Sequence, residues 1–274
     1  MITEEIIKHS SRLLGHDEIY LINGIIRKYK PKKCLEIGVA AGGSSIIILN
    51  AIKDIKNSFL ISLDINKKLY RDDKFETGYC VFENFPELTK KWKLFTGEQS
   101  HIFLDKLNLK FDFLLLDTAH FSPGELINII EVFPFLEDNA IIVIHDIMLH
   151  LPSNIGFDSI KPKYHPSNIF LFIALYGDKL IIENEKKQIE NIGAIRLYSN
   201  QRKYYLNYFM LLLTPWDYMP SEKHIQELRD FIKKYYRPEI YLRIFNTAVE
   251  ENKKYINTFQ QIYKEQYPLL IKYK

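Results

Sequence analysis

The 274-residue chain has only two cysteines, Cys34 and Cys80, and neither stands in a CxxC or cysteine–histidine spacing typical of zinc. No window reaches the roughly 18 consecutive apolar residues that a membrane-spanning helix requires. The first residues, MITEEIIKHSSRLL, lack the basic start and apolar core of a secretory signal. The net charge of +3 is spread along the chain and gives no indication of nucleic-acid binding. We therefore expect a cytoplasmic globular protein with a buried thiol at Cys34, no membrane span and no nucleic-acid partner.

Two signatures of phosphate binding are missing as well. In the segment GVAAGG (38–43) the middle glycine of the dinucleotide pattern GxGxxG is absent, and no GxxxxGKS or GxxxxGKT stretch occurs. A carboxylate, Glu36, precedes these glycines, where it would repel a pyrophosphate and attract a cation. These features disfavour an NAD(P)-dependent oxidoreductase. That interpretation stays open, beside a non-catalytic helical interaction protein on a degenerate nucleotide-binding fold.

From residue 33 on, short β-type runs alternate with helical windows. The strands are expected at 34–37, 59–64, 93–97, 111–117, 140–146 and 191–198. The helices are expected at 44–55, 98–107, 124–136 and 168–177, the last ended by Gly177, with one or two short helices in 65–92. Continuous apolar strands that alternate with helices form a parallel sheet covered on both faces. The sequence therefore predicts an α/β fold with a Rossmann-like, doubly wound sheet.

Three regions are expected: an N-terminal helical segment (1–30), a Rossmann-like domain (31–200) and a C-terminal helical extension (201–274). The extension contains two amphipathic windows, 222–236 and 239–263, whose apolar stripes either cover the sheet or form a homo-oligomer. Both alternatives remain open.

The segment 147–168 has three prolines and no hydrophobic periodicity. A loop of this length is often functional. We expect it to bind the acceptor, with His150, Tyr164 and His165 as contacts, and a structural connector is the equal alternative.

Polar side chains follow two of the expected strands. Ser122, Pro123 and Glu125 predict a capped helix start, which leaves 117–121 as a loop with Asp117 and His120. His145 and Asp146 end the next strand. Each of the four has a structural interpretation alone, such as a helix cap at Asp146. Because parallel strands end at one edge of the sheet, we expect them to converge beside Gly38 and form an active site.

The strand-end residues resemble the class I S-adenosylmethionine (SAM) methyltransferases. LEIGVAAGGSS (35–45) is similar to the first motif of that family, SLD (62–64) to its second-strand acid, and TGEQS (96–100) to its adenine-side segment. The resemblance covers about residues 33 to 198. It implies that Glu36 lies at the amino-acid end of SAM and Asp64 at the ribose. The cofactor-binding residues implied are Glu36, Gly38, Ala40, Gly42, Ser44, Asp64, Gly97, Glu98 and Asp117.

DTAH (117–120) and HD (145–146) resemble the metal-dependent O-methyltransferases of sugars and natural products. The resemblance implies methyl transfer to a hydroxyl of a sugar, a glycan or a small secondary metabolite. It implies catalytic roles for Asp117 and for His120 as the base, and a divalent metal, Mg²⁺, at Asp117, Asp146 and His145. The sugar-type enzymes tend to have Glu-Asp where this chain has His145-Asp146, so the third metal ligand is left open. Catechol-type enzymes have lysine at the His120 spacing and asparagine where Ile147 stands.

Overall fold

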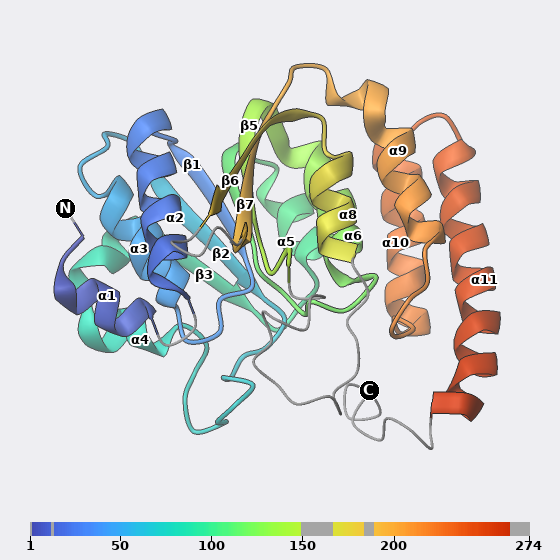
Figure 1. Ribbon diagram of the computed structural model, residues 1–274, viewed down its shortest axis with the longest axis horizontal. Helices are drawn as coiled ribbons and strands as arrows, with labels where there is room; N and C mark the ends of the chain where they lie inside the picture. The colour runs from blue at the N-terminus through green and yellow to red at the C-terminus, as the bar shows by residue number, and fades with distance from the viewer. Residues whose placement is uncertain (1, 12–13, 149–166, 184–188, 264–274) are drawn as a thin grey trace. The chain divides into compact units, whose positions relative to one another are not determined.

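The computed structural model describes residues 2–11, 14–148, 167–183 and 189–263 (Figure 1). The chain divides into two compact units. Unit 1 comprises residues 1–118, 135–145 and 176–200, and unit 2 comprises residues 119–134, 146–175 and 201–274. Three expected acceptor contacts, His150, Tyr164 and His165, lie outside the described residues. None of the helices in the described ranges combines the length and apolar character that crossing a membrane requires.

Unit 1 is built around a sheet whose described strands follow the order β3-β2-β1-β4-β5-β7-β6. They are β1 (Lys33–Ile37), β2 (Phe59–Asp64), β3 (Trp92–Thr96), β4 (Phe111–Leu116), β5 (Leu136–His145), β6 (Gly177–Glu183) and β7 (Ile189–Leu197). Strands β1 to β5 pair in parallel, and β7 is antiparallel to both β5 and β6. The apolar runs of β1 and β4 are buried, as expected for central parallel strands. The Rossmann-like α/β fold is therefore confirmed.

The helices of unit 1 include a group that packs together near the N-terminus, drawn in blue in Figure 1. They are α1 (Glu4–Ser10), α2 (His16–Tyr29) and α3 (Gly43–Ile52), with α4 (Tyr79–Asn84), the 3₁₀ helix η1 (Pro86–Lys91) and α5 (Ser100–Leu107) further along the chain. Helix α2 buries an apolar stripe that includes Ile19, Ile22 and Ile26, while its opposite face is exposed. Helix α3 is buried over its whole length, which its GSSIIILNAI sequence allows.

Unit 2 is helical in its described part. Its elements are α6 (Gly124–Val132), continuing into η2 (Phe133–Phe135), α8 (Ser167–Ala174), η3 (Gln201–Tyr204), α9 (Tyr205–Met210), η4 (Leu211–Leu213), α10 (Glu222–Tyr235) and α11 (Ile240–Tyr263). Aromatic rings fill its core: Phe133 stacks on Tyr208 with ring centroids 4.8 Å apart. The Tyr236 hydroxyl donates to the Ile130 carbonyl. The apolar stripes of α10 and α11 are buried within this packing.

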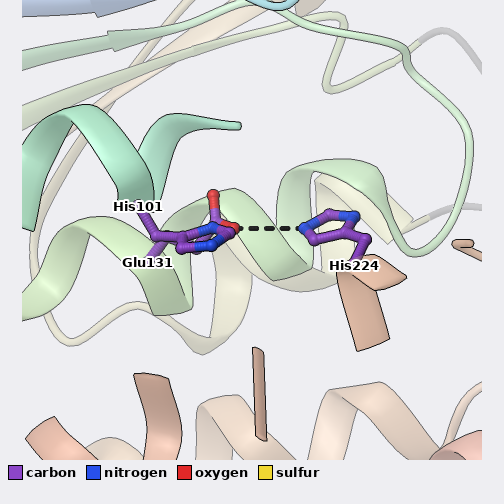
Figure 2. A group of neighbouring side chains, drawn as sticks. All are labelled: His101, Glu131 and His224. Atoms are coloured by element: carbon purple, nitrogen blue, oxygen red, sulfur yellow. Dashed lines mark hydrogen bonds and ion pairs between the residues drawn. The ribbon is translucent and has the colours of Figure 1, made fainter. Parts of the chain in front are cut away.

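Glu131 and His224 link α6 to α10 inside unit 2. Figure 2 shows Glu131 beside His224, with Oε1 and Nε2 3.3 Å apart. The Glu131 side chain is fully buried, and Asn128 donates to its other oxygen. A buried carboxylate requires such partners because burying an unpaired charge is costly.

The structure corrects the expected helix at 168–177. Helix α8 ends at Ala174, and Gly177 begins β6, a strand that the sequence analysis did not predict. A Cβ at Gly177 would lie 2.2 Å from the Arg196 carbonyl oxygen of β7. Gly177 is therefore needed for close strand pairing rather than for ending a helix. Strand β6 lies at the edge of the sheet and is mostly exposed on both faces. It therefore lacks the alternation of apolar and polar residues by which a half-buried strand is predicted from sequence.

The capping box expected at the start of α6 is also wrong. Helix α6 begins at Gly124, and its N-cap residue, Pro123, makes no side-chain cap bond. Glu125 Oε1 instead accepts a hydrogen bond from the His120 N–H at 2.7 Å. The Ser122 N–H donates to Asp217 at 2.7 Å. The glutamate is used by the loop before the helix and is not available as a cap.

Candidate active site

The first cluster lies in unit 1, where β1, β2 and β4 end. Gly38 has φ of +89°, and a Cβ on it would lie 1.7 Å from the Asp117 carbonyl oxygen. Its N–H donates to the Leu63 carbonyl at 2.9 Å, and the Asp117 N–H donates to the Ile37 carbonyl at 3.0 Å. Only glycine suits this position, because both the positive φ and the close approach exclude a side chain.

The rest of the glycine loop leads into α3. Gly42, with φ of +96°, is the N-cap residue of α3, and a Cβ there would lie 2.9 Å from Val81. Ala40 also has a positive φ, +48°, and its carbonyl accepts from the Gly78 N–H at 2.8 Å. Gly38 and Ala40 are partly exposed, whereas Gly42 is buried. The part of the loop nearest the strand ends is thus the part open to a ligand.

Asp64, at the end of β2, fixes the conformation of this loop. Its Oδ2 accepts from the N–H groups of Val39 at 2.9 Å and Ala40 at 3.1 Å, and its Oδ1 accepts from the Asn66 N–H at 2.8 Å. A carboxylate has about four lone-pair positions, so Asp64 retains capacity for a further donor. Asp64 is partly exposed, which leaves that capacity accessible.

Glu36 has a different environment from the one the sequence predicted. Its side chain is fully buried, and it accepts hydrogen bonds from the hydroxyls of Ser44 at 2.6 Å, Ser45 at 2.6 Å and Ser62 at 2.5 Å. The indole N–H of Trp92 donates to the Ser62 hydroxyl at 2.8 Å. Burial raises the pKa of Glu36 to about 7, against the opposing effect of the serine hydrogen bonds.

Glu36 and Ser44 are two of the expected cofactor-binding residues, and that role stays a prediction. Both side chains are buried, and the Ser44 hydroxyl donates to the Glu36 carboxylate. The carboxylate joins the end of β1 to the first turn of α3 and to β2. Its role in this arrangement is to hold the loop in place.

The adenine-side segment expected at 96–100 begins directly after β3. The Gly97 N–H donates to the Asp64 carbonyl at 3.0 Å, and Gly97 has φ of +94°. A Cβ on Gly97 would meet the Lys67 side chain at 2.4 Å. Glu98 is exposed. Gly97 thus lies beside the second-strand acid, as the motif order predicts.

A second cluster in unit 1 contains a histidine between two carboxylates. His145 Nδ1 lies 3.2 Å from Asp117 Oδ1, and His145 Nε2 lies 3.1 Å from Glu18 Oε2. His145 and Glu18 are buried, while Asp117 is about one-quarter exposed. Both ring nitrogens of His145 are engaged by carboxylates. The metal-ligand role expected of His145 stays a prediction.

The third cluster lies in unit 2, in the loop before α6. His120 Nε2 lies 2.9 Å from Asp146 Oδ2, and His120 Nδ1 lies 3.4 Å from Glu125 Oε1. Desolvation by burial would lower the pKa of His120, but the interactions with Asp146 and Glu125 outweigh it and raise the pKa to about 10. His120 and Asp146 both have left-handed backbone, with φ of +59° and +57°. Such conformations cluster at functional sites.

The expected site residues thus form contacts within each unit. Along the sequence, Asp117 and His120 are three residues apart, and His145 and Asp146 are consecutive.

The sequence analysis missed several contributing residues. Glu18, Ser45 and Ser62 were not predicted to take part, and Glu125 was interpreted only as a helix cap. Ser45 could have been found from its place in the GGSS run beside Ser44. Glu18 gave no signal, because it lies in an amphipathic helix 127 residues from His145.

Comparisons with known proteins agree with this fold. The family model described as "Methyltransferase domain" matches residues 35–147. The O-methyltransferase TomG from Streptomyces achromogenes, which is involved in tomaymycin synthesis and was solved with SAM, superposes with a TM-score of 0.53 at 14% identity, covering 73% of this chain and 92% of that chain. An O-methyltransferase from Bacillus cereus, solved with SAH, gives a TM-score of 0.50 at 14% identity, covering 70% and 89%. No curated protein sequence matches the chain significantly.

Together these findings define the class of protein. Residues 35–147 match the methyltransferase-domain model, and the sheet has the strand order of a Rossmann-like fold. The resemblance found in the sequence is therefore confirmed. The likeness to the solved structures concerns the fold.

Proposed function

We propose that this protein transfers a methyl group from SAM to a hydroxyl of a sugar, a glycan or a small secondary metabolite. The observation that carries the proposal is the loop from Gly38 to Gly42, braced by Asp64 at the carboxyl edge of a methyltransferase sheet. Ligands of open parallel sheets bind at this edge. The similar TomG structure holds SAM, and the involvement of TomG in tomaymycin synthesis supports the secondary-metabolite class.

The cofactor contacts are proposed for the exposed side of the loop. Gly38 and Ala40 offer backbone that a ligand can approach, and Asp64 has capacity left for a ribose hydroxyl. Gly97 and Glu98 stand where the adenine would lie. Asp117 would face the amino-acid end, since its backbone packs on Gly38.

A divalent metal remains part of the proposal. The carboxylates of Asp117 and Asp146 are the oxygen donors that Mg²⁺ prefers, and both are partly exposed, so the donor chemistry fits such an ion. When bound, the ion would lower the pKa of the acceptor hydroxyl and orient its oxygen. Water or the acceptor would complete the coordination, because both ring nitrogens of His145 are engaged.

His120 is proposed to handle the proton of the acceptor hydroxyl. Methyl transfer requires removal of this proton and in-line alignment of the hydroxyl oxygen with the methyl group. Next to Asp146 and Glu125, His120 holds its own proton, since its pKa is raised to about 10. It therefore accepts a proton only once the charge of these carboxylates is offset, and otherwise it donates a hydrogen bond to the acceptor oxygen.

Two further features belong to the proposal. The free thiols Cys34 and Cys80 are both buried, which is consistent with a reducing cytoplasm. A homo-oligomer remains proposed for the C-terminal helices, whose oligomeric state can be measured by light scattering.

Calorimetry with SAM is the first test. We expect the purified protein to bind SAM with a micromolar dissociation constant, and an absence of heat at millimolar SAM would reject the proposed function. Incubation of the protein with SAM and host extracts, followed by mass spectrometry of methylated products, then identifies the acceptor. Chelation with EDTA and restoration with Mg²⁺ tests the metal, and indifference to both would leave a metal-free enzyme.

A further inference from the structure

We propose that Glu18, on the N-terminal helix α2, is a positioning residue for Asp117 and acts through His145. This inference rests on the proposed function, because it assigns Asp117 to the cofactor side of the glycine loop. It adds a segment that lies outside residues 35–147, the range matched by the methyltransferase family model.

The geometry forms a continuous chain within unit 1. Glu18 Oε2 lies 3.1 Å from His145 Nε2, and the opposite ring nitrogen, Nδ1, lies 3.2 Å from Asp117 Oδ1. An imidazole held at both nitrogens can neither rotate nor flip without losing a contact. The orientation of the Asp117 carboxylate is therefore fixed through His145 by Glu18.

The burial of Glu18 indicates that its role exceeds helix capping. Glu18 Oε2 also accepts from the Gly15 N–H at 2.7 Å, at the start of α2. Glu18 is only 5% exposed and stands next to Ile19 of the apolar stripe. Burying a carboxylate is costly unless a partner compensates it. His145 is that partner.

Asp117 is the exposed end of this chain. Its side chain is about one-quarter exposed, whereas those of His145 and Glu18 are less than one-tenth exposed. Its backbone carbonyl packs on Gly38. The two buried residues thus orient a carboxylate that emerges beside the cofactor loop. This is the arrangement by which outer-shell carboxylates orient the side chains that touch a ligand.

The test uses Glu18→Gln, which keeps the size of the side chain and an oxygen for the Gly15 N–H. Asp17→Asn is the matched control, since Asp17 is an exposed acid in the same first turn of α2. The readout is the NMR spectrum of protein labelled with ¹⁵N-histidine. The His145 signals are identified by their loss in His145→Gln. We expect Glu18→Gln to change the chemical shifts of the His145 ring nitrogens. Asp17→Asn should leave them unchanged. An unshifted His145 spectrum in Glu18→Gln overturns the inference.

Calorimetry with SAM gives the functional readout without requiring the acceptor. We expect Glu18→Gln to weaken SAM binding about tenfold, at the lower end of the range for outer-shell partners, with a melting temperature near that of wild type. The double variant Glu18→Gln/His145→Gln should bind no more weakly than His145→Gln, because Glu18 acts through His145. Additive losses would instead assign Glu18 to capping alone.

The outcomes separate the two proposals. If wild type binds SAM and Glu18→Gln binds it equally well, the positioning role is rejected and the proposed function stands. If wild type does not bind SAM, the proposed function is rejected, and the positioning role with it. If Glu18→Gln does not fold, the His145→Gln variant decides: SAM affinity equal to that of wild type rejects the inference, and weakened affinity supports it.

Discussion

An ionisable side chain lies at the glycine loop of unit 1, and another lies in the loop before α6 in unit 2. The first has neutral hydrogen-bond partners, and the second has charged ones. Just before the first loop, in β1, the carboxylate of Glu36 is surrounded by neutral serine hydroxyls. In the second loop an imidazole, His120, is surrounded by the carboxylates of Asp146 and Glu125. Burial disfavours charge at Glu36 and raises its pKa, whereas the acids favour charge at His120 and raise its pKa.

The two environments suit different roles, a structural one for Glu36 and a proton-handling one for His120. The serine hydroxyls that donate to Glu36 come from α3 and β2, so the hydrogen bonds join these two elements to β1. The carboxylate that they hold is buried. The acids around His120 hold a proton at a partly exposed ring. The first arrangement suits a rigid platform for a cofactor, and the second suits a group that handles a proton.

Replacement of His120 is expected to have the largest effect on activity. We expect His120→Ala to lower methyl transfer by about 10²–10⁴-fold, the usual contribution of an acid–base group, while the SAM dissociation constant stays within about twofold of wild type. The release of S-adenosylhomocysteine with the identified acceptor measures the first, and calorimetry measures the second. His16→Ala, at an exposed position of α2, serves as the control. Near wild-type turnover in His120→Ala would remove His120 from the reaction.

Gly38→Ala tests the rigidity of the platform. A Cβ would lie 1.7 Å from the Asp117 carbonyl oxygen, and φ is +89°. We therefore expect the free energy of unfolding to fall by about 2–4 kcal/mol and SAM binding to be lost. The matched control is Gly24→Ala in α2, where a Cβ has no atom within 4 Å. That change should raise stability by about 0.5–1 kcal/mol. Unchanged SAM affinity in Gly38→Ala would contradict the role of the loop.

Glu36→Gln tests the environment of Glu36 through the pH dependence of protein stability. The pKa of Glu36 is about 7 in the folded protein, against 4.5 for an ordinary glutamate. Between pH 4.5 and 7 the Glu36 carboxyl is deprotonated in the unfolded chain and still protonated in the folded protein. The contribution of Glu36 therefore makes the free energy of unfolding fall as pH rises through this range, by up to roughly 3 kcal/mol.

Urea unfolding of wild type and Glu36→Gln at pH 5, 6, 7 and 8 measures this effect. We expect the variant to lose the decline that Glu36 causes, so that its stability relative to wild type increases with pH over that window. Parallel pH profiles for the two proteins would show that Glu36 titrates normally.

Much of the fold was predictable because it depends on local patterns. The apolar strands at 34–37, 59–64 and 111–117 alternate with helical windows, and all were found close to their predicted bounds. Strand β6 was missed because an exposed edge strand is defined by its pairing with β7, which no local pattern encodes. The capping box at Ser122 was wrong because the local motif competes with a nonlocal use of Glu125 and of the Ser122 N–H.

The sequence by itself determined the class of this protein. Its strand and helix periods, the glycine loop after β1 and the acid after β2 are local features, and they are sufficient to predict a SAM-binding sheet edge. Only the tertiary structure decided how the charged side chains are used. It buried Glu36 among serines, set His145 between Asp117 and Glu18, and placed His120 between two acids. Partners as distant as Glu18 and His145 are brought together by packing, and the ionisation of a side chain depends on those partners and on its distance from water.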